Sequence, residues 1–431
     1  MGISSRERKR RERSPGSGPR APSRAVNPRE PSPPPAPPLS ALLANPFYVR
    51  VWLAGSLTNS MRWLEIIVSS VTTFELTGSG FAVALVASMR AWPMLFAGAL
   101  AGVIAEGIER RRLLLAGQLL MMVSTAAMGV LAAMGVLAAW HLAVGGLGTG
   151  LVWATDMAVR RRLLADLSGD GLVARGVALD TVSNSVTRMI GPILGGIALE
   201  TIGVAAAFGV AALCHVISFA IALPVVAAQE MRKLAVRGLP RDVAEAAQIA
   251  FSNRTLLVAL IGTTLMNLFG FSYTAIVPVW GVESFNASPA VIGLLAAAEP
   301  AGSLIGGMLI AMRPLPWRPV VVFTVGTSVF IGSVGLAALS PIFAIAWLIL
   351  AVGGVGSAAF GTMQTLLVMT HTPVEARSRV MGLVTTCIGL GPAGSLALGG
   401  LSDSIGPAAA LVLMASIGLA GMALITRRGV D

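Results

Sequence analysis

The chain has 431 residues, of which 55% are hydrophobic and only 12% charged, with a formal net charge of +11 and a mean hydropathy of +0.80. This composition excludes an ordinary water-soluble protein, in which about 25% of residues are charged, and it predicts repeated membrane-spanning helices of about 20 apolar residues each. It also excludes a membrane β-barrel, because the alternating segments of about 10 residues that a barrel requires are absent from the sequence.

The first 45 residues are predicted to form a disordered cytoplasmic tail that is basic and rich in proline. The basic run RERKRRER leads into prolines and not into an apolar core, so this segment is not a secretory signal. A segment with so few large apolar residues cannot bury enough surface to fold, and its charge favours weak attraction to anionic lipid. We expect no nucleic-acid partner, because no folded basic domain or interleaved aromatic residues accompany the charge.

Twelve apolar segments follow, each near or above the length that crosses a bilayer. They predict an all-α membrane protein with two six-helix bundles, at residues 46–226 and 255–427. A polar cytoplasmic linker at 227–254, part of it an amphipathic helix, is expected to join them, and 428–431 form a short tail. The predicted spans are 48–74, 80–103, 112–135, 137–158, 176–198, 204–226, 255–281, 289–312, 319–339, 341–369, 380–400 and 406–426.

The distribution of charge predicts how the chain is oriented. Arg62, Arg90 and Arg188 lie within spans, and the other arginines and lysines fall in the tails or in alternate loops, when those at the loop edges are counted with the loops. The opposite loops carry acidic residues instead. By the positive-inside rule, both termini and the basic loops face the cytoplasm of a multi-pass protein. The excess of arginine over lysine is typical of a G+C-rich bacterial gene, so we expect a bacterial cell membrane. The acids of the opposite loops are Glu75, Glu200, Glu283 and Asp403.

The two halves of the chain repeat each other. The segment NPFYVRVWLAGSLTN (Asn45 to Asn59) aligns with NRTLLVALIGTTLMN (Asn253 to Asn267), and MIGPILGG (Met189 to Gly196) aligns with GLGPAGSL (Gly389 to Leu396). The order of the segments is preserved. This predicts two similar halves related by an axis along the membrane normal.

A polar stripe runs along the first span. Thr58, Arg62, Glu65, Ser69 and Thr72 are spaced three or four residues apart, so they share one helix face. A central charge facing lipid costs at least ~2.5 kcal/mol. This face is therefore expected to line a water-filled substrate cavity. The alternative is that Arg62 and Glu65 neutralise each other and hold helices together.

Similar stripes occur in spans 5, 7 and 10. The stripe in span 5 contains Asp180, Asn184 and Thr187 or Arg188, and weaker stripes contain Asn267 and Gln364. The residues predicted to form the substrate cavity are Thr58, Asn59, Arg62, Glu65, Ser69, Arg90, Asp180, Asn184, Arg188, Asn267 and Gln364.

Twelve spans in a parallel repeat resemble the major facilitator superfamily. The loop GVIAEGIERRR (Gly102 to Arg112) resembles its signature between spans 2 and 3, and GPILGG (Gly191 to Gly196) resembles the glycine-proline motif of its antiporters. The segments FELTGSGFAVALVASMRAWPMLFAGALAGVIAE and NLFGFSYTAIVPVW resemble its branch of bacterial drug, macrolide and enterobactin exporters. The resemblance covers about residues 42–426.

This resemblance implies alternating access of two halves, a small organic substrate, proton exchange, a monomer and no cofactor. It implies that spans 1, 4, 7 and 10 line the cavity and that span 5 borders it. The chain departs from the family pattern at Glu106 and Gly107, which replace an aspartate and an arginine, and at Val144, where many antiporters carry an arginine. The expected cytoplasmic gate comprises Gly102, Glu106, Arg110, Arg111, Arg112 and Asp156, and Glu106→Gln is expected to change the ratio of the two access states.

Gly191 and Pro192 are predicted to bend span 5, because proline removes a backbone hydrogen bond. Whether such a bend gates transport or only shapes the helix is left open. Asp156 and Arg160 are one helical turn apart and are expected to pair. His215, in span 6, is expected to bond a backbone carbonyl.

Two carboxylates in the spans are candidates for proton coupling. Glu299 lies about halfway along span 8, where burial disfavours its charged form. Glu65 is the second candidate, although Arg62 lies one turn away on the same face. The alternative for Glu299 is a structural hydrogen bond near Pro300. The three intramembrane arginines favour an anionic or zwitterionic substrate, unless Asp180 compensates them.

The spans contain no cluster of a nucleophile with a base and no metal-ligand spacing, so neither an enzyme nor a metal site is expected. The P-loop pattern of ATP-driven pumps is also absent from the sequence. The sequence therefore favours a secondary transporter, and most of all an exporter. The alternative is a receptor or scaffold that uses the same fold without transporting anything.

Overall fold

The computed structural model describes residues 39–107, 109–169, 171–225, 239–312 and 316–429. It does not describe the side chains of 94–107, 154, 157, 158, 239–244, 375, 378, 428 and 429. Most of the predicted tail and the first part of the predicted linker therefore lie outside the described residues. The described chain is helical and contains no strand.

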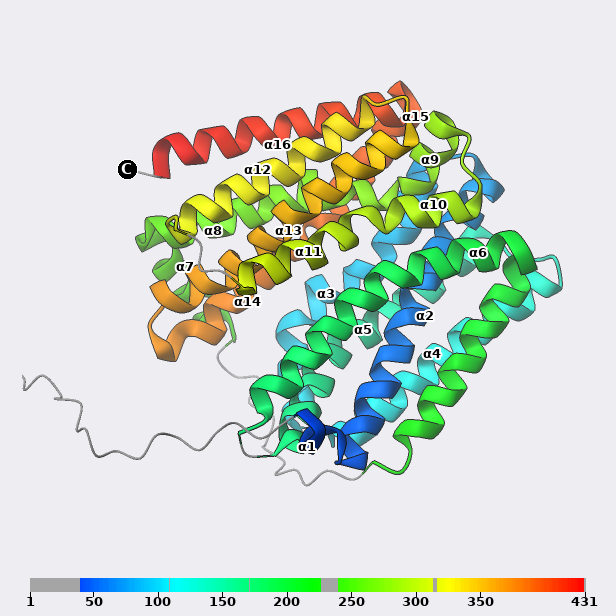
Figure 1. Ribbon diagram of the computed structural model, residues 1–431, viewed down its shortest axis with the longest axis horizontal. Helices are drawn as coiled ribbons and strands as arrows, with labels where there is room; N and C mark the ends of the chain where they lie inside the picture. Colours follow the sequence, from blue (N-terminus) through cyan, green and yellow to red (C-terminus); the bar gives the residue numbers. More distant parts are fainter. Residues whose placement is uncertain (1–38, 108, 170, 226–238, 313–315, 430–431) are drawn as a thin grey trace, which may run out of the picture. The chain divides into compact units, whose positions relative to one another are not determined.

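Figure 1 shows the helices in chain order, the N-terminal half in blue to green and the C-terminal half in green to red. The N-terminal half contains α1 (Leu39–Leu43), α2 (Pro46–Thr77), α3 (Gly80–Gly107), α4 (Arg110–Ala133), α5 (Ala139–Ser168) and α6 (Val173–Ala222). The C-terminal half contains α7 (Leu239–Ser252), α8 (Arg254–Leu265), η1 (Met266–Gly270), η2 (Phe271–Ala275), α9 (Val277–Phe285), α10 (Pro289–Ala296), α11 (Ala298–Met312), α12 (Pro319–Ala338), α13 (Phe343–His371), η3 (Val374–Ala376), α14 (Arg377–Gly389), α15 (Gly391–Ile405) and α16 (Pro407–Gly429).

Ten of the twelve predicted spans coincide with one of these helices or with a run of them, and spans 5 and 6 both lie in α6. Within the described residues, eight helices or helix runs are long and apolar enough to cross a membrane. Large apolar side chains such as Val123, Leu213, Leu348 and Leu424 are exposed on the outside. An all-helical fold with an apolar exterior is what a bilayer demands, because every backbone polar group must be bonded internally.

The repeated asparagines have the same role in both halves. The Asn45 side chain accepts hydrogen bonds from the backbone N–H groups of Phe47 and Tyr48, and so caps α2. Asn253 caps α8 in the same way, by accepting from Thr255 and Leu256. Asparagine is favoured at this position because its side chain satisfies N–H groups that the helix leaves free. The repeat seen in the sequence is therefore a repeat of helix starts.

The C-terminal half is more broken than its sequence predicts. Span 7 changes from α8 to one π-helical turn and one 3₁₀ turn before α9. Spans 8 and 11 are each divided in two, at Ala297 and at Leu390. Pro300 and Pro392 lie just beyond these breaks, and each lacks the N–H that would bond back across it. The two breaks lie in the second and the fifth spans of the C-terminal half.

Helix α6 runs through the predicted bend. Its backbone stays helical at Gly191 and Pro192, and the break between spans 5 and 6 lies at Gly203, where φ is +76°. The glycines near Pro192 serve close packing instead. A Cβ at Gly191 would collide with Trp63, and one at Gly195 would press against the Leu64 backbone. These two glycines therefore let α6 lie directly against α2.

The two halves meet along two seams. Helix α6 packs against α10 and α11, and α3 packs against α14 and α15. A Cβ at Gly196 would collide with the carbonyl oxygen of Pro289, and a Cβ at Gly293 with that of Pro192. A Cβ at Gly399 of α15 would press against the carbonyl oxygen of Gly80, at 2.7 Å. Small residues at these places allow the backbones of opposite halves to touch.

Two boundaries differ from the prediction. Residues 39–45 do not belong to a disordered tail, because they form α1 and the cap of α2, with Leu42 fully buried. The second difference concerns the end of the predicted linker, 227–254, because its predicted amphipathic helix is α7 (Leu239–Ser252). Its Ala246 and Ala250 are buried in a cluster with Val380 and Val384 of α14, so it packs on the C-terminal half.

Candidate functional site

An ion pair joins the two halves in the middle of the molecule. The guanidinium of Arg188, on α6, donates a hydrogen bond to the Glu299 carboxylate, on α11. The Arg188 side chain is 27% exposed, whereas that of Glu299 is 1% exposed. Arg188 is therefore partly accessible, whereas Glu299 is enclosed.

Aromatic rings surround this bridge. The Arg188 guanidinium carbon lies 5.6 Å from the ring centre of Trp63 on α2 and 5.8 Å from that of Phe271 in η2. Both distances allow a cation–π interaction. Tyr273 is fully buried and close enough to interact electrostatically with Glu299 and Arg188. The Glu299 Oε1 atom has no hydrogen-bond partner among the described residues.

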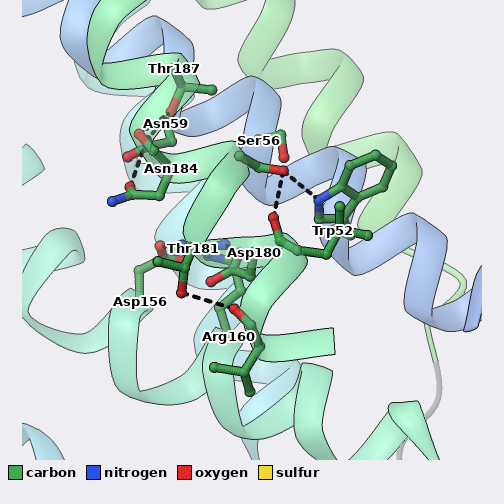
Figure 2. A network of polar contacts seen from close by, with 12 residues as sticks. Trp52, Ser56, Asn59, Asp156, Arg160, Asp180, Thr181, Asn184 and Thr187 are labelled. Atoms are coloured by element: carbon green, nitrogen blue, oxygen red, sulfur yellow. Dashed lines mark hydrogen bonds and ion pairs between the residues drawn. The ribbon is translucent and has the colours of Figure 1, made fainter. Parts of the chain in front are cut away.

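A second charged network lies within the N-terminal half. Asp156 of α5 binds Arg160 at 3.4 Å, as predicted for residues one turn apart, and it also pairs with Arg62 at 3.7 Å. Arg160 in turn donates to Asp180 of α6. Figure 2 shows Asp156, Arg160 and Asp180 gathered between these helices. Two arginines and two aspartates thus neutralise each other in a buried position.

An amide cluster continues this network. The Asn59 side-chain amide donates to Asn184 and Thr187 (Figure 2). Its oxygen accepts from Arg62 at 3.1 Å. The Arg62 guanidinium also lies 5.5 Å from the ring centre of Trp153. Asn59, which adjoins the stripe of span 1, therefore contacts the stripe of span 5 across the interface of α2 and α6.

Glu65 does not pair with Arg62. Its Oε1 atom accepts a hydrogen bond from Thr125 of α4 at 2.9 Å and lies 2.8 Å from the Nε2 atom of His215 on α6. The expectation that His215 bonds a backbone carbonyl is therefore wrong. In the alternative to a cavity, Arg62 and Glu65 are expected to pair with each other, and this part is wrong because Arg62 is directed to Asp156; each of them does join α2 to another helix.

Arg90 of α3 completes this part of the interior. It donates to the backbone oxygen of Glu65 at 3.3 Å and to the Ser69 hydroxyl at 2.8 Å. A small cavity with room for about one water molecule adjoins Glu65, Ser69 and Arg90.

The remaining predicted cavity residues form pairs within their own halves. Thr58 donates to Gln118 of α4 at 2.9 Å. In the C-terminal half, Gln364 of α13 donates to the Thr263 hydroxyl at 2.6 Å, and Asn267 donates to the Thr263 backbone oxygen. The weaker stripes of spans 7 and 10 are therefore in contact.

The predicted gate at the basic end of the bundle is divided among several partners. Arg110 binds Asp166, Arg111 donates to the backbone oxygen of Leu223, and Arg112 binds Glu109. Asp156 belongs to the buried network of Arg62 and Arg160 instead, so the prediction that it joins the arginine cluster is not supported. The side chain of Glu106 and the surroundings of Gly102 lie outside the described residues.

Two carboxylates close the acidic end, where the loops carry Glu and Asp. Glu200, at the end of span 5, accepts from the Ser288 hydroxyl at 2.7 Å and from the Ala290 N–H at 2.9 Å. It thereby caps α10, in the opposite half. The hydrogen bonds from Ser288 and then Ala290 lower the pKa of Glu200. A carboxylate is well placed there, because the start of a helix carries free N–H groups and a partial positive charge.

Asp403 makes the equivalent contact in the other direction. Placed at the end of span 11, it accepts from the Ser79 hydroxyl at 2.7 Å and from the N–H groups of Gly80 and Phe81 at 2.5 and 3.1 Å. It thereby caps α3 of the N-terminal half. We call Glu200 with α10 and Asp403 with α3 the two latches. Each joins the end of the fifth span of one half to the start of the second span of the other.

Sequence reasoning missed several of these partners. Trp63, Trp153 and Phe271 gave no signal beyond that of an ordinary apolar residue, although each lies beside an arginine. Glu200 and Asp403 appeared as topological markers, and only the fold shows that they bond across the halves. A comparison of the two halves of the repeat would have shown that Glu200 and Asp403 occupy equivalent positions. The described residues include no group of three or more potential metal ligands.

The sequence matches a protein-family model described as transmembrane secretion effector over residues 37–430. It is 28% identical over 380 residues to the enterobactin exporter EntS of Salmonella choleraesuis, covering 86% of this chain and 89% of that protein. It is 25% identical over 370 residues to the multidrug efflux pump Tap of Mycobacterium bovis, covering 78% and 83% respectively.

Solved structures of transporters share the fold. A bacterial homologue of the human lysosomal transporter Spinster superposes with a TM-score of 0.68 at 14% identity, covering 89% of this chain and 98% of that one. The nucleoside transporter NupG gives a TM-score of 0.67 at 12% identity, with coverage of 88% and 99%. At these identities the likeness concerns the fold alone.

Proposed function

Because the chain belongs to the transmembrane secretion effector family of the major facilitator superfamily, we propose that it is a proton-coupled secondary exporter of a small organic molecule. It works as a monomer by alternating access of its two halves, in a bacterial cell membrane, with both termini in the cytoplasm. The observation that carries this proposal is the Arg188–Glu299 ion pair between the halves. A charge pair across a moving interface is where substrate, proton and conformation can compete.

The pair can couple a proton to a substrate through simple electrostatics. A buried carboxylate needs either a cation beside it or a proton on it. In this state Arg188 supplies the cation to Glu299. When the halves separate, Glu299 must take a proton or bind a donor group of the substrate. A proton and a substrate donor then exclude each other at one carboxylate, which is the requirement for antiport.

The charge of the interior narrows the class of substrate. Asp156 and Asp180 compensate Arg62 and Arg160, so the positive excess predicted from the arginines alone is smaller than expected. Arg188 is the partly exposed cation and Glu299 its acidic neighbour. We therefore favour a zwitterion, or an acid that also carries a hydrogen-bond donor. Trp63 and Phe271 beside Arg188 suit a substrate with an aromatic ring.

Transport by the purified protein in proteoliposomes tests the proposal. A panel of radiolabelled zwitterions, organic acids and lipophilic cations would be offered with and without a pH gradient. We expect a zwitterionic or acidic aromatic compound to move against its own concentration gradient when the pH gradient is present. Arg188→Ala should reduce its affinity about 10-fold or more, because a hydrogen bond to a charged group contributes about 1.5–3 kcal/mol. Arg161→Ala, at an exposed arginine, serves as the control.

Lipophilic cations as the best substrates, with Arg62→Ala and Arg188→Ala both harmless, would contradict the assignment of the substrate class. If no compound moves but ligands bind, the chain is a receptor or scaffold on this fold, and the proposed transport is wrong.

A further inference from the structure

The contact between Glu65 and His215 has no part in the function proposed so far. Both side chains are almost completely buried, at 3% and 0% exposure, and their nearest atoms are 2.8 Å apart. They lie inside the N-terminal half, between α2, α4 and α6. The bridge of Arg188 and Glu299, by contrast, connects the halves. This buried pair is therefore a separate titratable group.

One proton lies between the two atoms in contact. If Glu65 is ionised, its carboxylate only accepts, so His215 Nε2 carries the proton; if Glu65 is protonated, it donates to Nε2. The other ring nitrogen, Nδ1, has no hydrogen-bond partner among the described residues. Within the described part of the chain, Nδ1 is therefore an unpartnered ring nitrogen at which the pair can take up a second proton.

The charged residues around the pair determine how a second proton changes the net charge of the interior. Facing it are Arg90 from α3, Arg62 from α2 and the Thr125 hydroxyl from α4, and the cavity wall from α5 adds Thr149. In the state with one proton, Arg62, Arg90 and Arg160 balance Asp156, Asp180 and Glu65. A second proton leaves the buried cluster with one uncompensated positive charge. Such a charge is costly in a low-dielectric interior, so its uptake must be coupled to a rearrangement or to an entering anion.

The position of the pair links it to the central bridge. Glu65 is two residues from Trp63, whose ring lies against Arg188. Leu64, between them, is the residue against which Gly195 of α6 packs. A shift of α2 would therefore move Trp63, which lies against the Arg188 side chain. The water-sized cavity lies beside Glu65, on the side of Ser69 and Arg90.

We propose that Glu65 and His215 form a second proton-binding site, which deepens the proposed proton-coupled export. The first proton is shared by Glu65 Oε1 and His215 Nε2, and the second binds His215 Nδ1. No bond other than those to the proton is made or broken.

The chain contains three histidines, which makes a direct test practical. A His141→Asn/His371→Asn variant retains His215 as its one histidine, and the ¹⁵N resonances of that imidazole can be followed from pH 5 to 9 in nanodiscs. We expect them to move between the positions of the neutral and charged ring. Glu65→Gln in this background should move the midpoint by about one pH unit or more, because a neighbouring charge is lost. Glu75→Gln, an acid at the far end of the same helix, is the matched control.

A His215 resonance that stays in one charge state over the whole range would overturn the proposal, as would a midpoint unaffected by Glu65→Gln. The titration requires no substrate and no flux, so its result is independent of the transport assay. Transport without titration of His215 refutes this site alone, and titration without transport refutes the exporter.

Discussion

Glu299 combines near-complete burial with a partner from the opposite half, and both properties decide how it responds to substitution. Glutamine has the volume of a protonated glutamate but cannot take part in proton exchange. In Glu299→Gln, we expect substrate binding and passive exchange to persist, while uphill transport driven by a pH gradient is lost. Counterflow and gradient-driven uptake measured on the same proteoliposomes separate the two activities. Wild-type uphill rates in a correctly folded variant would remove Glu299 from the mechanism.

Glu200 lies outside the spans, and its contact with α10 should respond to pH. Its pKa in the closed state is lowered, so the contact is intact above the ordinary carboxyl range and is lost as the pH falls through the lowered value. We expect the acidic end to open more often when the pH there falls below about 4, the ordinary value for glutamate. The labelling rate of a cysteine placed at Ser288, in a variant without Cys214 and Cys387, can follow this opening.

Because the Ser288 hydroxyl is itself a donor to Glu200, the labelling experiment needs a second reporter, at Ser402 of the other latch. Glu200→Gln should remove that part of the pH response which belongs to Glu200. A response that is unchanged in this variant would assign it to another group.

For single residues, the sequence predicted which charged side chains are buried but not which side chains they bond. Arg62 and Glu65 share a helix face, yet helical spacing does not determine whether two side chains bond each other or residues of other helices. The rotation of α2 against α5 and α6 directs Arg62 to Asp156 and Glu65 to His215. These partners depend on how the helices pack against each other, and the periodicity of one sequence contains no information about that packing.

The helices of opposite halves approach each other closely at glycines, so a substitution of one glycine tests how much this close packing matters. In Gly196→Ala, the new Cβ would collide with the carbonyl oxygen of Pro289, and α6 and α10 would have to separate. We expect this overpacking to destabilise the closed acidic end by about 1–3 kcal/mol. The population of the two access states can be measured by double electron–electron resonance between spin labels on α6 and α10.

Gly307→Ala on α11 is the matched control, because a Cβ there meets no atom within 4 Å. This change should leave the distance distribution in place, and alanine should favour the helix slightly. If Gly196→Ala and Gly307→Ala behaved alike, close packing at the α6–α10 seam would not govern closure.

Helix positions were largely predictable, since spans of about 20 apolar residues reveal themselves by length and charge. The breaks within the spans were harder to predict than the spans themselves. Pro300 and Pro392 are visible in the sequence, but the π-helical turn at Met266–Gly270 carries no comparable residue signal. The glycine-proline motif predicted a bend at Gly191, whereas its glycines serve contact with α2 and α10. A glycine permits either use, and the neighbour that approaches it decides between them.

For the whole molecule, the two latches act on the same movement from opposite seams. A rigid-body separation of the halves at the acidic end must break both. We expect Glu200→Gln/Asp403→Asn to open that end more than either single change. The reporter is a cysteine at Ser402, a buried side chain beside Asp403, labelled by a membrane-impermeant thiol reagent in a variant without Cys214 and Cys387.

The same measurement tests the orientation. Labelling of intact cells should increase in the double variant, because the acidic loops are predicted to lie outside the cell. Labelling confined to inverted vesicles would place the basic loops outside instead and would reverse the predicted topology.

The Asp403 latch also determines when during synthesis the protein can acquire its closed form. Ser79 and Asp403 are separated by 324 residues, whereas Glu200 and Ser288 are separated by 88. A chain inserted from its N-terminus can form the Glu200 contact once α10 has emerged. The first N–H groups of α3 must wait for α15, nearly the last helix to be made. Until then, a nascent chain has one seam closed and the other open, and a ribosome-bound chain that ends before residue 403 should remain accessible at the start of α3.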